Sequence, residues 1–324
     1  MNNTLSLQTS SMISRRLVRI KALQALYAWQ QSSENSTQEA INLLKKDIAN
    51  FHNVYLFLLD WPYQLSQALQ EKVEIEKSKF YPDNDKIRQL QLLGRISGVK
   101  HLHREASALM PIDFPFHWDE LKNQVDEWYN LILQWPETKD LNIFDEPPIS
   151  LQIPFLKTFF EEFINRSESF NQTLEEIYPR WSDDDPFVYR EIVKTIESLK
   201  ESGEITVLSA PLNTSEEVEM AMSLVLTSAR NSKQYEQLIS EITDNWDPSR
   251  IASIDLIIIK LAITEFLHFP EIPPKATINE YLEITKNYST PNSSKFVNGI
   301  LDKLKKNLET QGMIKKSGRG LINK

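Results

Sequence analysis

The hydrophobic and polar residues of this 324-residue chain follow a helical period in almost every segment. Apolar residues that recur three or four positions apart lie on one side of a helix and predict that it is amphipathic. The longest alternating stretch, residues 205–208, is too short to build a sheet. The sequence therefore predicts an all-α fold. Its expected helices cover residues 14–31, 36–50, 53–75, 84–109, 117–135, 151–165, 186–201, 215–230, 232–242 and 251–267, with two more within 273–308.

Proline and acidic residues predict where several of these helices begin, bend or end. Pro62 predicts a kink in the third helix, because proline removes one helical hydrogen bond. A segment rich in proline and acidic residues, 136–148, predicts a break. The three aspartates at 183–185 precede Pro186 and predict a loop that caps the next helix.

Composition narrows the possible chemistry. Hydrophobic residues make up 41% of the chain, which is ample for a core, and the absence of cysteine excludes disulfides and cysteine-ligated metals. Seven glycines are few, and no glycine-rich phosphate loop is present. His101 and His103 are two positions apart, so on a helix they diverge and do not share a metal. We therefore expect no catalytic residues, metal or cofactor, and no enzymatic activity.

The chain shows no targeting pattern. Its first dozen residues lack the apolar core of a signal peptide, and the resemblance described below begins at Ile13, so we expect translation to start at Met12. The most apolar run, 256–267, is too short to span a bilayer and contains Lys260 and Glu265. We expect a soluble, cytoplasmic protein.

Charge is distributed unevenly along the chain. The net charge is −9, yet residues 1–31 sum to +4, residues 275–324 sum to +6 and the middle sums to −19. This asymmetry predicts an anion-binding surface assembled from the two ends. The alternative is that the lysine-rich ends are ordinary solvated surface.

Three blocks of sequence carry a resemblance to a known family. Residues 14–29 read SRRLVRIKALQALYAW, residues 251–267 read IASIDLIIIKLAITEFL, and residues 273–308 contain INE and KFVNGILDK. In this order they resemble the NusB transcription-antitermination family. The chain departs from the family pattern at Ser289 and Asn292, which puts the backbone of that turn and its affinity for RNA in question.

The resemblance implies a NusB-like helical bundle that is elaborated by an additional central helical region. It also implies that Gly299 lies inside the last helix, where it would allow a close helix crossing. The expected organisation is a flexible start at 1–12, the first part of the domain at 13–50, an inserted helical region at 51–210, the second part at 211–309 and a basic flexible tail at 310–324.

The resemblance implies an RNA-binding factor without enzymatic activity. Such a factor pairs with NusE, a ribosomal small-subunit protein, binds boxA-type single-stranded leader RNA, and joins the RNA polymerase elongation complex through other Nus factors. Arginine suits RNA because its planar donors match phosphate oxygens and stack on unpaired bases. The implied RNA-binding residues are Arg15, Arg16, Arg19, Lys286, Ser294 and Lys295, and the implied partner-binding residues are Tyr27 and Glu265.

Two other interpretations fit parts of the sequence. The acidic middle could make the chain a protein-interaction scaffold that does not bind RNA. Ribosomal RNA cytosine methyltransferases carry a similar helical domain, but they require a following doubly wound domain, and this chain ends soon after Leu308. The role of the inserted helices, the oligomeric state and the preferred RNA sequence stay open.

Overall fold

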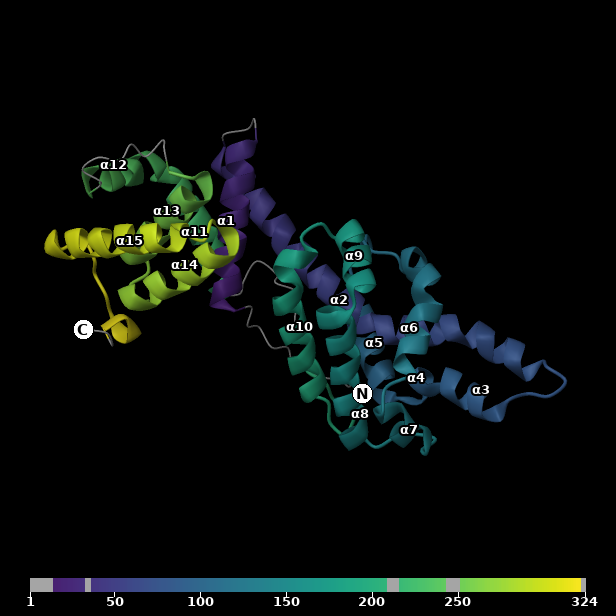
Figure 1. Ribbon diagram of the computed structural model, residues 1–324. Helices are drawn as coiled ribbons and strands as arrows, with labels where there is room; N and C mark the ends of the chain where they lie inside the picture. Colours follow the sequence, from purple (N-terminus) through teal and green to yellow (C-terminus); the bar gives the residue numbers. More distant parts are fainter. Residues whose placement is uncertain (1–13, 33–35, 209–215, 243–250, 322–324) are drawn as a thin grey trace. The chain divides into compact units, whose positions relative to one another are not determined.

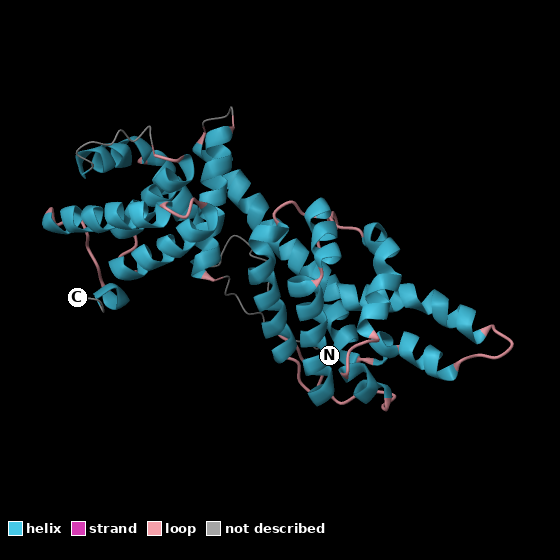
Figure 2. Cartoon of the chain, in the orientation of Figure 1, coloured by secondary structure: helices cyan, strands magenta, loops and turns pink. Residues whose placement is uncertain are grey.

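The computed structural model describes residues 14–32, 36–208, 216–242 and 251–321. Every regular element in these ranges is a helix, as Figures 1 and 2 show, and they contain no strand. The predicted all-α fold is therefore confirmed. The expected flexible start at 1–12 lies outside the described residues.

The chain divides into two compact units. Residues 49–210 form one unit, here called the central unit. Residues 12–48 and 211–324 form the other, the terminal unit. Whether the central unit is an insertion between two parts of one domain stays a prediction.

The terminal unit is built around one buried helix. Every residue of α13 from Ile257 to Phe266 is buried, because this run has apolar residues on all sides. α1 packs against α11 and α13, and α14 and α15 pack against each other and against α13. The elements are α1 (Arg15–Gln31), α11 (Glu216–Arg230), α12 (Ser232–Ile242), α13 (Ser253–His268), α14 (Pro274–Tyr288), α15 (Ser293–Thr310) and the short 3-10 helix η4 (Gly318–Leu321).

The central unit begins within the longest helix, α2, which also contributes its first turns to the terminal unit. The two helices predicted at 36–50 and 53–75 are one helix of 41 residues, with Pro62 inside it. The elements are α2 (Thr37–Lys77), α3 (Asn84–Leu90), α4 (Leu92–Arg95), α5 (Ser97–Leu109), the 3-10 helix η1 (Trp118–Gln124), α6 (Val125–Ile132), α7 (Glu137–Asn142), α8 (Ile149–Phe160), the π-helix η2 (Glu161–Arg166), α9 (Glu168–Ile177) and α10 (Trp181–Glu197).

A cluster of aromatic side chains forms the core of the central unit. Trp61 of α2 stacks on Phe170 with ring centroids 4.4 Å apart, and it meets Phe163 edge-on at 4.6 Å. Trp128 and Phe159 complete its surroundings. These contacts join α2, α6, α8, η2 and α9, so the central unit has a hydrophobic core of its own.

Three local predictions were wrong. The segment 136–148, which was expected to be a break, contains helix α7. Residues 183–185 lie inside α10, which begins at Trp181 and contains Pro186 six positions into the helix. Asp184 is buried and accepts a hydrogen bond from the Tyr178 hydroxyl, so this carboxylate belongs to the core and not to a capping loop. Gly299 lies inside α15, but no atom approaches within 4 Å of the position that a Cβ would take. A close helix crossing at Gly299 is therefore absent from the described residues.

The end of the chain is attached to α13. Lys316 Nζ donates to the backbone oxygens of Glu265 (3.2 Å) and Phe269 (2.9 Å), and the Ser317 amide donates to Pro270 O at 3.1 Å. Burial lowers the pKa of Lys316 to about 8. These bonds hold the described part of 310–324, which was expected to be a flexible tail.

Candidate nucleic-acid interface

A buried ion pair links the first helix to the centre of the terminal unit. Arg19 of α1 donates two hydrogen bonds of 2.8 Å each to the carboxylate of Glu265 on α13. The side chains are only 3% and 0% exposed. Burial by itself lowers the pKa of Arg19, but the Glu265 carboxylate more than reverses this effect and keeps the guanidinium charged.

Further hydrogen bonds complete this network. Thr277 Oγ1 of α14 donates to Glu265 Oε1 at 2.6 Å, and the Arg19 guanidinium lies 5.8 Å from the centre of the Tyr281 ring. Burial raises the pKa of Tyr281 well above its usual value of 10, and the Glu265 carboxylate adds to this shift. The network joins α1, α13 and α14, and it corrects two predictions: Arg19 does not face RNA and Glu265 does not face a protein partner. Both are structural.

Arg16 lies on the surface and is held by an acidic neighbour. Its guanidinium donates bidentately to Glu280 of α14, at 2.9 and 3.0 Å. The hydrogen bond from Arg16 lowers the pKa of Glu280, so the pair stays ionised at neutral pH. Because 43% of the Arg16 side chain is exposed, its outer edge can still contact a ligand.

Arg15 is exposed but has acidic surroundings. It lines a groove of about 330 Å³ together with Glu271 and three glutamates of the first turn of α11. Phe269, Ile272 and Met220 form apolar parts of the same groove. Carboxylates repel phosphate, so this groove lowers the expected contribution of Arg15 to RNA binding.

The turn between α14 and α15 presents cations and hydroxyl groups together. Lys286 and Lys295 are exposed on either side of it, and Ser294 is partly exposed. Lys286 pairs with Glu283 at 2.5 Å on the surface. The Ser293 hydroxyl lies 3.0 Å from Ser289 Oγ and 2.8 Å from Thr290 Oγ1. A helix N-terminus beside lysine and serine side chains favours phosphate oxygens.

Tyr27 is accessible, with 41% of its surface exposed on α1. Exposure leaves it free to contact a protein partner, as the resemblance implies. Among the residues that sequence reasoning missed, Thr277, Tyr281 and Lys316 bind or surround the buried ion pair. Their types and spacing are those of ordinary helical residues, so the sequence offered no signal for these contacts.

Comparison with known proteins covers part of this surface. Residues 191–306, from the second half of α10 to α15, match the model of the NusB family. They belong to the NusB family. The NusB match includes α13, α14 and α15, but it does not include 14–29, so the resemblance of α1 to the first NusB helix stays a prediction.

Curated NusB proteins match about a third of the chain. A "Transcription antitermination protein NusB" from Salinibacter ruber is 41% identical over 104 residues, which is 32% of this chain and 65% of the relative. The protein of the same name from Chloroherpeton thalassium is 40% identical over 105 residues, which is 32% of this chain and 50% of the relative. The chain thus spans less than two thirds of the length of these NusB relatives. No solved structure matches it.

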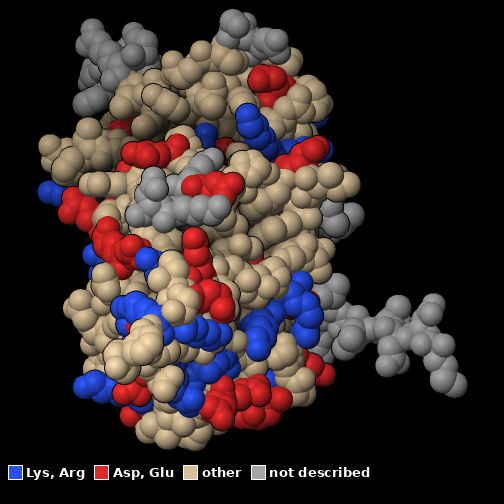
Figure 3. Space-filling model, turned by 90° about the vertical axis from the view of Figure 1, so that its right-hand side faces the viewer, with Lys and Arg blue, Asp and Glu red and all other residues tan. Residues whose placement is uncertain are grey.

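The central unit carries an excess of acidic side chains. Residues 49–210 contain 28 acidic and 16 basic side chains, and on the face drawn in Figure 3 blue groups gather in the lower half with red groups beside them. His103 bonds to Asp60 at 2.5 Å, whereas His101 lies against Gly203, so the two histidines diverge. Over the described ranges, no three His, Asp or Glu side chains could hold a metal ion together. None of the helices described is long and apolar enough to cross a membrane.

Proposed function

We propose that this chain is a transcription antitermination factor without enzymatic activity, and that it binds boxA-type single-stranded RNA together with NusE. The observation that supports this proposal is the NusB match, which includes the turn between α14 and α15 with its exposed lysines. The complex would associate with elongating RNA polymerase through other Nus factors in the cytoplasm and suppress premature termination.

The proposed RNA surface is smaller than the sequence implied. Lys286, Lys295 and Ser294 hold the phosphates at the start of α15, and the outer edge of Arg16 extends this surface along α14. Arg19 lies beneath the surface and fixes α1 on α13 and α14. Arg15 is assigned a weaker contact because of its acidic groove.

NusE is proposed to contact the exposed face of α1 that carries Tyr27. Tyrosine suits this role because its ring buries a large area while its hydroxyl reaches a polar partner. Glu265 supports the interface indirectly, since its pair with Arg19 holds α1 in place.

A binding assay with matched RNAs tests the proposal. The intact chain is titrated into a labelled boxA-type RNA and into a scrambled RNA of equal length, each with and without NusE. Tighter binding to boxA, increased by NusE, supports the proposal. Equal and weak binding to both RNAs in both conditions contradicts it and favours the scaffold interpretation.

Substitution at the turn sharpens this assay. The double variant Lys286→Ala/Lys295→Ala should weaken boxA binding by about tenfold, or about 1.4 kcal/mol. It should also make the slope of log K against log salt concentration shallower, by about 0.7 for each lost phosphate contact on a single strand. The matched control is Lys157→Ala/Lys200→Ala in the central unit, where each lysine pairs with a glutamate. An equal loss in both variants would indicate an effect of net charge alone.

A further inference from the structure

The central unit ends in an exposed aromatic tip. Phe80 and Tyr81 follow the C-terminus of α2, in the connection to α3 at the right of Figure 1, and are 89% and 83% exposed. Their rings meet edge-on with centroids 4.7 Å apart. Two adjacent aromatic side chains with this exposure form an apolar surface that burial would stabilise.

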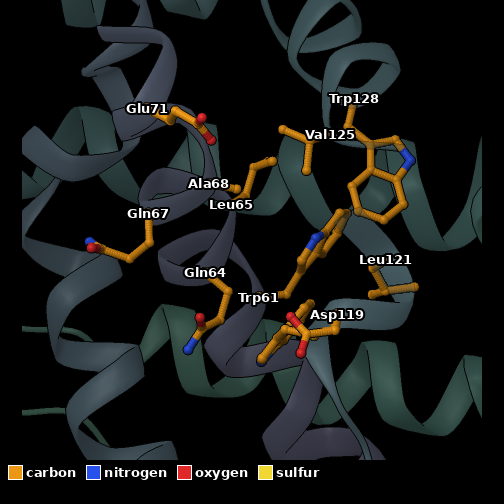
Figure 4. Close-up of a pocket in the computed structure, with 11 residues that line it drawn as sticks. Trp61, Gln64, Leu65, Gln67, Ala68, Glu71, Asp119, Leu121, Val125 and Trp128 are labelled. Carbon is orange, nitrogen blue, oxygen red and sulfur yellow. The ribbon is translucent and has the colours of Figure 1, made fainter. Parts of the chain in front are cut away.

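A pocket in the same unit has the complementary properties. It has a volume of about 400 Å³ and is lined by residues of α2, η1 and α6, as Figure 4 shows. Its walls include the apolar side chains of Leu65, Leu121 and Val125, and its edge includes the carboxylates of Glu71 and Asp119. A pocket of this size accommodates one or two aromatic side chains.

Trp61 lies at the base of this pocket, with its ring beside that of Trp128. Its side chain is 1% exposed and packs into the aromatic cluster of the central unit, so the base of the pocket is closely packed and apolar. An aromatic side chain that enters the pocket would pack against this base.

Tip and pocket lie along one helix, α2. The pocket residues of α2 end at Glu71, six positions or about 9 Å before its last residue, Lys77. Gln64, Ala68, Glu71 and Ile75 recur at helical spacing and form a stripe from the pocket toward the tip, and Ile75 is itself exposed. Because the intervening residues are helical, the tip cannot reach the pocket of its own chain.

We propose that the Phe80–Tyr81 tip of one chain docks in the Trp61 pocket of a second copy, and that the reciprocal contact forms at the same time. A two-fold axis that crosses the stripe of α2 places the tip of each chain in the pocket of the other. An interface with this symmetry joins two copies and forms a dimer. Four buried aromatic side chains of about 150–250 Å² each supply about 600–1,000 Å², and the stripe of α2 adds to this area. That total approaches the roughly 1,000 Å² that a specific interface needs.

Charge favours a second copy over nucleic acid as the occupant. Lys77 and Lys79 flank the tip, and although they pair with Glu74 and Glu76, about half of each lysine side chain is exposed. These cations complement the carboxylate of Glu71 at the edge of the pocket. The same carboxylate repels phosphate.

Sedimentation of the intact chain over a range of concentrations tests the proposal. The wild-type mass should rise from 37.7 kDa toward twice that value. Phe80→Ala/Tyr81→Ala should weaken the dimer by about 30-fold or more, as truncation of interface hot spots does. Ala68→Trp fills the pocket from its wall without altering the tip and should have the same effect. Ile112→Ala, at a fully exposed residue of the same unit, should leave the mass unchanged.

Three outcomes would overturn the proposal. The first is a wild-type chain that stays monomeric up to about 1 mM, where only a contact weaker than about 4 kcal/mol would escape detection. The second is a dimer that survives both the tip variant and the pocket variant while circular dichroism shows each to be folded. The third is a loss of RNA binding in the tip variant with no change in mass, which would assign the tip to nucleic acid.

Discussion

The cores of the two units are held together by different dominant contacts. In the terminal unit, charged side chains reach the interior: Arg19 pairs with Glu265, and the buried Lys260 pairs with Glu236 at 2.6 Å. In the central unit, aromatic rings around Trp61 fill the interior. A buried ion pair tolerates little change in geometry, because each charge depends on its partner, whereas an aromatic cluster can repack.

This difference predicts where the molecule is sensitive to substitution. In the terminal unit, single hydrogen-bonded contacts fix the position of α1, which carries Arg16 and Tyr27 of the proposed binding surface. In the central unit, stability is spread over many ring contacts. Tryptophan fluorescence separates the two, since five of the seven tryptophans (61, 118, 128, 135 and 181) lie in the central unit.

The largest effect is expected from Arg19→Ala. The substitution leaves the Glu265 carboxylate buried without its cation, which should cost about 3–5 kcal/mol of unfolding free energy. Chemical denaturation monitored by circular dichroism should show this loss of stability. The unfolding transition monitored by tryptophan fluorescence should shift less. Equal shifts of the two transitions would contradict the assignment of Arg19 to the terminal unit alone.

A double variant tests whether the instability of Arg19→Ala comes from the loss of the ion pair or from the buried carboxylate that is left unpaired. Arg19→Met/Glu265→Leu removes both ions and should recover a large part of the stability lost in Arg19→Ala, because no unpaired charge remains. A double variant as unstable as the single one would show that shape at this position matters more than charge.

A smaller effect is expected in the aromatic cluster. Phe163→Leu keeps an apolar side chain where the ring contacts Trp61 and Trp135, so the surrounding rings can close part of the gap. The expected loss is about 1–2 kcal/mol, measured by the tryptophan fluorescence transition. A loss as large as that of Arg19→Ala would mean that the central core does not repack.

An intermediate case is Asp185, where burial and the neighbouring Asp184 and Asp183 raise the pKa from 3.8 to about 6. Between these two pH values the folded state binds more protons than the unfolded state, so stability falls as pH rises. Asp185→Asn should therefore stabilise the protein by about 1 kcal/mol at pH 7, after allowance for solvent screening, and should change little at pH 4. Urea titrations at both pH values check this. A stabilisation by Asp185→Asn that occurs only at pH 4 would contradict the prediction.

The smallest effect is expected from Glu283→Gln. Its pair with Lys286 is exposed, so the midpoint of unfolding should not move measurably. Removal of the carboxylate frees Lys286, so boxA-type RNA should bind slightly more tightly when the variant is titrated into the labelled RNA. Weaker binding would show that Lys286 does not contact RNA.

Most helices could be predicted from the sequence because their apolar stripes are wide. α9 could not: only Phe170 and Leu174 are buried among its ten residues, which is too few for a clear period. The start of α10 was also missed, since three aspartates before a proline usually indicate a loop. Burial of Asp184 depends on the hydroxyl of Tyr178, and composition does not reveal such a contact.

The accessibility of the candidate site residues was predicted in part. Lys286, Lys295, Arg16 and Tyr27 are accessible, as a binding role requires. Arg19 was assigned to RNA from the family resemblance, but it is buried, and its partner Glu265 is 246 positions away. A pairing over that distance depends on how α1 and α13 pack, and helical periodicity contains no such information.

The continuity of α2 has a consequence for any attempt to separate the two units. The boundary at 48/49 falls in the interior of this helix, where Phe51 and His52 are buried and His52 bonds to the Leu208 carbonyl. A truncation there would expose an apolar helix end and leave four amide groups without partners. A protease would likewise have to unwind the helix before it could cut. Fragment designs should therefore keep α2 whole. One continuous series of backbone hydrogen bonds runs through this helix, so unfolding that starts at one end extends toward the other.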